Sequence, residues 1–250
     1  DDDKIDLTAM QENLSSYKGK TSTSSPSPHE WENAFGDADV VFCITITSSL
    51  SGTYNSAVIA KDIYEHNHTG RKVYVLDSLS TGPEIALFIE KIAELIKAGF
   101  APDDIYKTLL EYKDKTHLYF SLASLNNFAK NGRISPVIAA GIGLLGVRVV
   151  GKASDEGTLL PLDKCRGEKR ALKKLIDHLK ECGYTDGKII IAHNNNEAGA
   201  LELKKLIENT FGIFNGTIQK TRALCSYYAE PGSLLIGFEA SLCNHKPYKD

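Results

Sequence analysis

The chain has 250 residues, enough for one large domain or two of ordinary size, and its 42% hydrophobic and 24% charged residues are typical of a globular protein. A formal net charge of −3 excludes the broad basic surface that nucleic-acid-binding proteins need. The five cysteines include no C-x-x-C pair, which excludes a zinc site and a disulfide framework, so we expect reduced thiols in a cytoplasmic protein.

The first half of the chain alternates strands and helices. Residues 6–8 offer a helix start, and residues 24–28 form a turn-rich loop. The run "DVVFCITI" (39–46) is continuously apolar and β-branched, as in parallel strands that are buried on both faces. The pattern then predicts a helix over 54–66, a strand over 71–77, and helices over 83–99 and 102–116. This order predicts a doubly wound, mostly parallel sheet.

The second half has a more mixed pattern. We expect a strand at 116–124, a short helix ending at 131–132, a helix capped by Ser135, two strands over 147–166 joined by a turn at 155–157, a helix over 167–183, a strand over 188–193, a helix over 197–211, and closing strands at 217–224 and 233–240. The sequence therefore predicts an α/β fold with an N-terminal domain (1–115) and a C-terminal domain (116–250) whose sheet is mixed.

The strongest local signal is the stretch "ITITSSLSGTYNSA" (44–57), where an apolar strand leads through a hydroxyl-rich loop into a helix. Ligands of open α/β sheets bind at such carboxyl ends of strands. A helix that starts at Gly52-Thr53 presents unpaired N–H groups and a positive dipole end, which suit an anion, and Ser51 adds a hydroxyl donor. The alternative is a loop whose Ser and Thr side chains only cap the helix.

Ser51 does not lie in a nucleophile elbow. That motif, G-x-S-x-G, needs glycines where this chain has Ser49 and Thr53. His117 and His193 lie at the ends of predicted strands and are the histidines that could serve as a base. An enzyme acting on an acyl substrate through Ser51 or a histidine therefore stays open as an alternative.

The stretch "GIGLLG" (141–146) matches G-x-G-x-x-G, but a predicted helix precedes it and a strand follows, the reverse of the dinucleotide-binding context. Val147 and Arg148 replace the last residues of a P-loop. We expect no nucleotide site, no cofactor and no metal. The longest apolar run, residues 137–147, is also shorter than the roughly 20 residues that span a bilayer.

Two basic features have both a structural and a functional interpretation. Arg166 belongs to a cationic cluster at the start of the helix 167–183, where positive charge opposes the helix dipole. Such a cluster is either a solvated helix face or a docking surface. Arg133 follows Gly132, a helix stop, and is either a surface residue or an anion partner.

Six segments together resemble the DegV family, and they cover nearly the whole chain in order: "TSSPSP" (23–28), "ITSSLSGTYNSA" (46–57), "VLDSLSTG" (75–82), "LNNFAKNGRIS" (125–135), "KCRGEKRAL" (164–172) and "EPGSLLIGFE" (230–239). The resemblance implies two α/β domains with a ligand cavity between or beside them. It also implies that the protein binds one long-chain fatty acid, with the tail buried and the carboxylate held by hydroxyl groups.

Matching the motifs places the carboxylate donors at Thr23 and Ser51, with Ser24, Gly52 and Thr53 beside them. Family members of the FakB type present the acid to a separate ATP-dependent fatty acid kinase, which forms an acyl phosphate for phospholipid metabolism. The resemblance thus implies a lipid carrier rather than an enzyme. It makes Arg166 the natural docking or phosphate-binding residue and Arg133 a weaker candidate, and it allows transient contact with a membrane.

The chain departs from the family pattern at two places. The family usually begins with a β-α unit that this chain is expected to lack. Near the C-terminus, Tyr228 stands where the family commonly has a histidine, and Glu230 replaces a glycine. Tyrosine can donate a hydrogen bond but supplies no cation near neutral pH. An interaction module with a vestigial pocket is therefore a further alternative.

Overall fold

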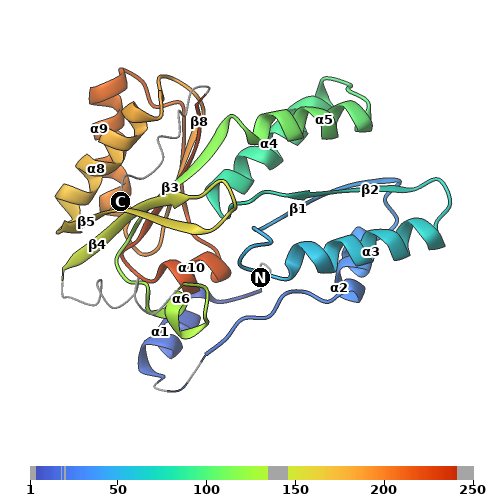
Figure 1. The fold of residues 1–250 in the computed structure, drawn as a ribbon, viewed down its shortest axis with the longest axis horizontal. Helices are drawn as coiled ribbons and strands as arrows, with labels where there is room; N and C mark the ends of the chain where they lie inside the picture. Colours follow the sequence, from blue (N-terminus) through green and yellow to red (C-terminus); the bar gives the residue numbers. More distant parts are fainter. Residues whose placement is uncertain (1–3, 18, 20, 135–145, 241–250) are drawn as a thin grey trace.

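The computed structural model describes residues 4–17, 19, 21–134 and 146–240. It contains a parallel sheet of two strands and a mixed sheet of six strands, which lie toward opposite ends of an elongated molecule (Figure 1). This confirms the expected α/β class. The helix expected after Ser135 and most of the "GIGLLG" stretch lie outside the described residues.

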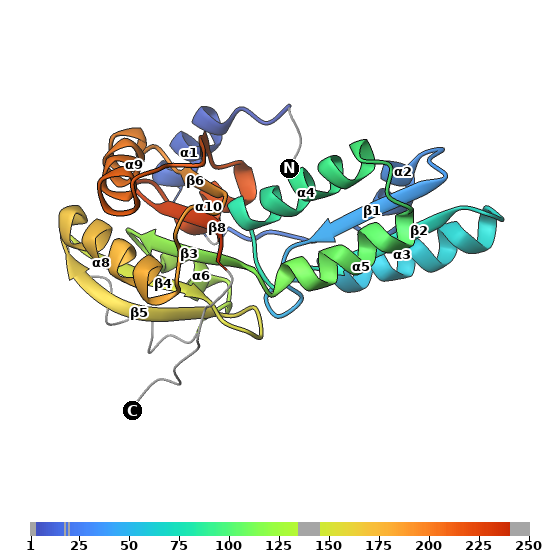
Figure 2. The same cartoon turned by 90° about the horizontal axis from the view of Figure 1, so that it is seen from above.

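The parallel sheet is formed in the first half of the chain. β1 pairs with β2 in register from Val40↔Lys72 to Thr45↔Asp77. Its two faces carry different side chains because neighbours along a strand point to opposite sides: Cys43 packs toward α2 and α3, and Phe42 and Ile44 pack toward α4 and α5 (Figure 2). The elements are α1 (Leu7–Ser16), α2 (Pro28–Phe35), β1 (Val40–Thr45), α3 (Thr53–Asn67), β2 (Lys72–Asp77), α4 (Pro83–Lys97) and α5 (Pro102–Lys113).

The second half of the chain forms the six-stranded sheet in the order β5-β4-β3-β8-β6-β7. β6 and β7 are parallel and the other neighbours are antiparallel, so the sheet is mixed, as expected. The elements are β3 (Thr116–Leu122), α6 (Asn126–Lys130), β4 (Val147–Ala153), β5 (Leu159–Arg166), α8 (Glu168–Glu181), β6 (Ile189–His193), α9 (Glu197–Phe211), β7 (Gly216–Lys220), α10 (Ala223–Ala229) and β8 (Leu234–Glu239).

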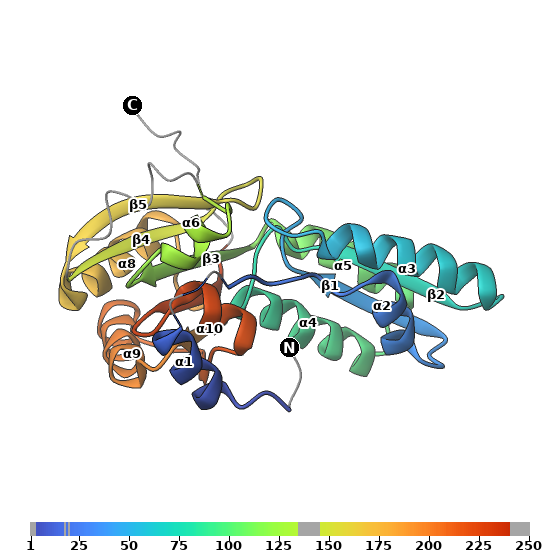
Figure 3. The ribbon, with the colours of Figure 1, turned by 90° about the horizontal axis from the view of Figure 1, so that it is seen from below.

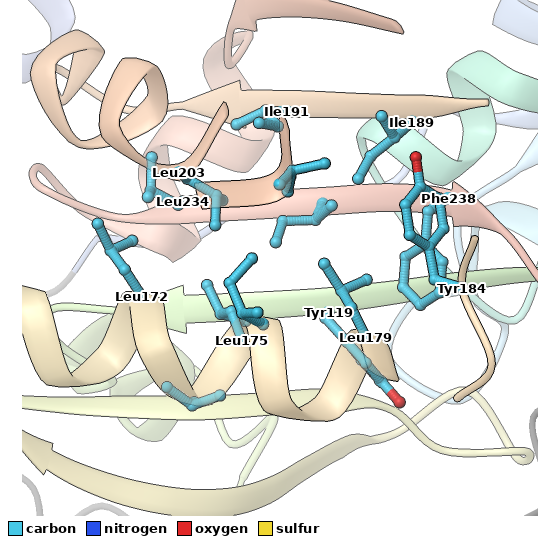
Figure 4. Close-up of a cluster of buried hydrophobic side chains, with 14 of the residues drawn as sticks. Tyr119, Leu172, Leu175, Leu179, Tyr184, Ile189, Ile191, Leu203, Leu234 and Phe238 are labelled. Carbon is cyan, nitrogen blue, oxygen red and sulfur yellow. The ribbon is translucent and has the colours of Figure 1, made fainter. Parts of the chain in front are cut away.

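One face of this sheet is covered by α8 and α9. Leu172, Leu175 and Leu179 of α8 point at the strands and pack with Tyr119 and Phe238 (Figure 4). The i, i+3, i+7 spacing of these leucines gives α8 its apolar side, while its lysines face solvent. The alternate residues of β3 point to the opposite face of the sheet, where they belong to a second hydrophobic cluster.

Two helices were not expected from the sequence pattern. α2 begins within the stretch expected as a loop, where Ser27 and Glu30 form a capping box and Pro28 occupies the first turn. α10 begins at Ala223, so the strand expected over 217–224 ends early, at Lys220 of β7. Both helices matter for function, since they frame the cavity described below.

The segment between α1 and α2 crosses between the two halves of the molecule. α1 lies against α10, and the chain then runs to α2 beside the parallel sheet (Figure 3). α4 likewise belongs to the first half of the chain and packs on β8 and β6 of the second sheet. A division at residue 115 would fall between α5 and β3, and it stays a prediction.

Cys43, Cys165 and Cys225 are free, whereas Cys182 is disulfide-bonded. The expectation that all five cysteines are reduced thiols is therefore wrong for Cys182. No helix in the described part of the chain is long and apolar enough to cross a membrane.

Candidate functional site

A cavity of about 730 Å³ lies between the two sheets. Its apolar wall comes mainly from the second sheet, where Leu118, Phe120 and Leu122 are the β3 residues that point away from α8. Leu235 of β8 and Ile85 of α4 complete this wall. The alternation of one strand thus supplies both the α8 core and the cavity lining.

The polar part of the cavity begins with the loop that follows β1. Ser51, Gly52 and Thr53 all line the cavity. The hydroxyl oxygens of Ser51 and Thr53 are 2.7 Å apart, and the Thr53 backbone N–H donates to the Ser51 hydroxyl at 3.3 Å. Gly52 is the N-cap of α3 and makes no side-chain cap, and the first turn holds no acidic residue. The positive end of the α3 dipole therefore faces the cavity without a carboxylate of the protein to neutralise it.

A second hydroxyl pair comes from the two ends of the chain. Thr23, in the segment between α1 and α2, lies with its hydroxyl 2.8 Å from that of Tyr228 on α10. Ser24 also lines the cavity. Phe128 of α6 packs on the Tyr228 ring with centroids 4.9 Å apart, which fixes the ring orientation. Tyr228, which stands at the position of the expected histidine, thus contacts Thr23, the predicted carboxylate donor.

The two pairs have the same hydrogen-bonding capacity. Each contains two O–H groups, and one of these is used in the hydrogen bond within the pair. One O–H in each pair is left to donate elsewhere. The Ser51–Thr53 pair and the Thr23–Tyr228 pair can therefore offer one donor each to the two oxygens of a carboxylate.

The two arginines that the sequence singles out lie in different places. Arg133 lines the cavity and donates from Nη1 to the Asn131 carbonyl at 2.6 Å. Arg166 ends β5 and pairs with Val147, whereas the cavity lies at the other end of that hairpin, near Leu159. At about 3.3 Å per residue, Arg166 is about 20 Å from that end of β5. The structure thus brings Arg133 to the site and leaves Arg166 outside it.

No histidine among the described residues lines the cavity. The His117 ring lies 3.2 Å from the Ala240 carbonyl, and His193 is buried at the end of β6. Ser51 contacts a threonine hydroxyl rather than an imidazole. Among the described residues, the side chain that hydrogen-bonds Ser51 is therefore not a general base. The described residues also contain no cluster of side chains suited to bind a metal ion.

Several residues that shape the site are not indicated by the sequence pattern. α10 brings Leu224 and Cys225 to the cavity wall, and the Ser154–Thr158 turn brings Gly157. The Glu230 carboxylate accepts from the Ser124 hydroxyl at 2.9 Å and from the Asn127 N–H at 3.1 Å, which ties α10 to the start of α6. Glu230, which stands at the position of a family glycine, thus caps the neighbouring helix α6. No local sequence pattern predicts this contact.

A cavity with an apolar wall, paired hydroxyls and a helix N-terminus is the kind of site that α/β proteins use to bind an amphipathic molecule with an anionic group. The sequence profile described as "Uncharacterised protein, DegV family" matches residues 1–241. The chain belongs to the DegV family.

Relatives of known structure contain fatty acids. A DegV domain-containing protein of Streptococcus pneumoniae is 41% identical over 239 residues, which are 96% of this chain and 85% of that protein. A DegV family protein from Eubacterium eligens loaded with heptadecanoic acid has a TM-score of 0.94 at 41% identity, over 96% of this chain and 87% of that one. The Streptococcus pneumoniae Fatty Acid Kinase (Fak) B3 protein loaded with linoleic acid has the same TM-score and identity, over 96% of this chain and 86% of that one.

Proposed function

We propose that this protein is a non-catalytic carrier that encloses one long-chain fatty acid. The tail lies along the apolar wall and the carboxylate lies between Ser51 and Thr23. The observation that carries the proposal is the presence of two hydroxyl pairs, Ser51–Thr53 and Thr23–Tyr228, in a cavity that also has an apolar wall. Each pair has one O–H left to donate. The fatty acids in the solved relatives support the ligand class.

The energetics of such a ligand suit this cavity. Each methylene removed from water contributes about 0.8 kcal/mol, so a long tail supplies most of the affinity. A buried carboxylate is costly unless charge-assisted hydrogen bonds replace its water. The free O–H of each hydroxyl pair and the N–H groups at the start of α3 can donate these hydrogen bonds. The head group then sets the orientation of the ligand.

We further propose that the carrier presents the acid to a separate kinase, which transfers phosphate from ATP to form an acyl phosphate. The name of the solved Streptococcus pneumoniae neighbour, Fatty Acid Kinase (Fak) B3 protein, supports this partner. Arg133 lines the cavity, so among the described residues it is the cation that we assign to stabilise the transferred phosphate. Arg166, about 20 Å away by strand length, can contribute to docking the partner but not to this contact.

The proposal is tested by denaturing extraction and mass spectrometry of the purified protein, followed by titration with oleic acid and oleyl alcohol. We expect a co-purified fatty acid and at least tenfold tighter binding of the acid than of the alcohol, because only the acid offers a charged acceptor. No extracted fatty acid and no binding would overturn the carrier. An acyl adduct on Ser51 would instead indicate an enzyme.

A further inference from the structure

Glu84 is a buried carboxyl group that the proposed function does not use. It lies in the first turn of α4 and is 4% exposed. None of the ion pairs formed within the described residues includes it. Burial raises the pKa of Glu84 to about 7, and hydrogen bonds from Ser80 and Thr116 partly oppose this rise. A carboxyl that is costly to bury and has no cationic partner calls for a structural explanation.

The Glu84 carboxylate joins the two halves of the molecule. One oxygen accepts from the hydroxyl of Ser80, a residue of the β2–α4 loop that lines the cavity. The other accepts from the hydroxyl of Thr116 at 2.8 Å. Thr116 begins β3 of the second sheet and lies outside the cavity lining. Glu84 therefore fixes a cavity loop to a strand of the opposite sheet.

A continuous chain of hydrogen bonds leads from Glu84 to the hydroxyl loop. The carbonyl of Ser80 accepts from the Thr47 N–H at 2.9 Å, and the Thr47 hydroxyl accepts from the Ser49 N–H at 3.2 Å. Ser51 is two residues further along the same loop. Only two residues, Ser80 and Thr47, thus separate the Glu84 carboxylate from the segment that carries the proposed carboxylate donor.

The backbone of Glu84 is also held in place by the second sheet. Gly237 of β8 lies directly beneath the start of α4, where an added Cβ would lie 2.5 Å from the Glu84 nitrogen. The first turn of α4 therefore packs directly on the β8 backbone, at a distance that only a glycine allows. Movement of the Ser80 loop relative to the second sheet therefore has to break a hydrogen bond of Glu84.

We propose that Glu84 is a positioning residue: by binding Ser80 and Thr116 together, it fixes the 47–51 loop, and with it Ser51, at the distance from the second sheet that a bound carboxylate requires. This inference rests on the proposed function for the identity of the ligand. The link itself consists of hydrogen bonds within the chain and does not depend on which ligand is bound.

Thr116→Val gives the sharpest test, because Thr116 does not touch the cavity and the substitution keeps the side-chain shape. We expect amide exchange at Thr47 to become about tenfold faster and oleic acid affinity to fall about tenfold. Exchange in β6, at Ile190 and Ile191, should not change. Thr108→Val is the matched control, since the Thr108 hydroxyl bonds only its own helix, at the Asp104 carbonyl. It should leave both readouts as in the parent protein.

Unchanged exchange at Thr47 in Thr116→Val would overturn the positioning role, as would a uniform increase across both sheets, which would indicate general destabilisation. This readout needs no ligand, so it remains decisive even if the protein binds no fatty acid and the proposed function fails.

Glu84→Gln and Glu84→Leu provide a second comparison. Gln keeps an acceptor for Thr116 and can donate to Ser80, so it should retain affinity within about threefold, whereas Leu removes both bonds and should lose at least tenfold. Equal affinities of a folded Leu variant and the parent would also overturn the inference.

Discussion

The hydroxyl of Thr23 lies 2.8 Å from the hydroxyl of Tyr228, although 205 positions separate the two residues in the chain. This contact joins the segment before α2 to α10 within the lining of the cavity. In the proposed function, the O–H groups of Tyr228 and Thr23 form one pair, of which one O–H donates to the carboxylate.

Removing the Tyr228 hydroxyl should weaken fatty acid binding without changing the cavity shape. For Tyr228→Phe we expect a ten- to hundredfold loss of oleic acid affinity, about the effect of losing one hydrogen bond to a charged group. Isothermal titration measures it. Tyr227→Phe is the matched control, since Tyr227 bonds Thr21 and Asn131 and does not line the cavity. Equal losses in the two variants would contradict a head-group role for Tyr228.

Ser51→Ala should reduce affinity by a similar factor and leave the affinity for oleyl alcohol within about twofold of the parent, because only a carboxylate uses the charge-assisted bond. Ser48→Ala, in the same loop but outside the cavity lining, serves as the control. Competition with a fluorescent fatty acid gives both affinities. If Ser51→Ala bound acid as tightly as Ser48→Ala does, the proposed cradle would be wrong.

Gly237→Ala should destabilise the fold by forcing α4 away from β8. The added Cβ would lie 2.5 Å from backbone atoms of Pro83 and Glu84, and we expect the free energy of unfolding to fall by about 1–3 kcal/mol. Urea denaturation measures the change. Gly212→Ala is a useful comparison, because that glycine has φ 81° and open space around it, so only the backbone conformation costs energy, about 1 kcal/mol. A smaller loss at Gly237 than at Gly212 would show that the contact can relax.

Stability should depend on pH through Glu84. Its pKa is about 7 in the folded protein and 4.5 in its ordinary state, so between these values the folded state binds more protons than the unfolded state. Glu84 therefore stabilises the fold fully below pH 4.5, and this contribution, about 3 kcal/mol at most, is lost as the pH rises through 7.

The measurement compares urea unfolding of the parent and Glu84→Gln at pH 5, 6, 7 and 8. The free energy of unfolding of the parent relative to the Gln variant should fall as the pH rises. Glu90→Gln, an exposed substitution on the same helix, controls for the change in net charge. A difference between parent and Gln variant that stays constant over this range would show that Glu84 does not take up a proton there.

Most of the fold could be predicted because its signals are local. The apolar run at 39–46 contains β1, and α4 begins at Pro83, as the sequence predicts. α2 is not among the expected helices, although Ser27, Pro28 and Glu30 form a complete helix start, because serines and prolines are also typical of a loop. The start of α2 could therefore be predicted from the sequence, whereas the start of α10 has no comparable capping signal.

The site could be predicted in part. The loop with Ser51 stands at the end of a strand, and its hydroxyls and helix start can be seen in a short window. That Thr23 meets Tyr228, and that Arg133 rather than Arg166 lines the cavity, depends on how the two sheets face one another. Glu84 carries no signal at all, because an acidic residue after Pro83 is an ordinary helix start.

The sequence by itself determined the strands, the helices and the chemical character of the head-group loop, since hydrophobic period, capping and turn residues act over a few positions. Only the tertiary structure decided which hydroxyls are paired, which arginine lines the cavity and that Glu84 links Ser80 to Thr116. The Thr23–Tyr228 and Glu84–Thr116 contacts join the first half of the chain to the second, and their distances follow from the packing of α4 on β8 and of α10 beside α6. Packing of that kind is a property of the whole chain.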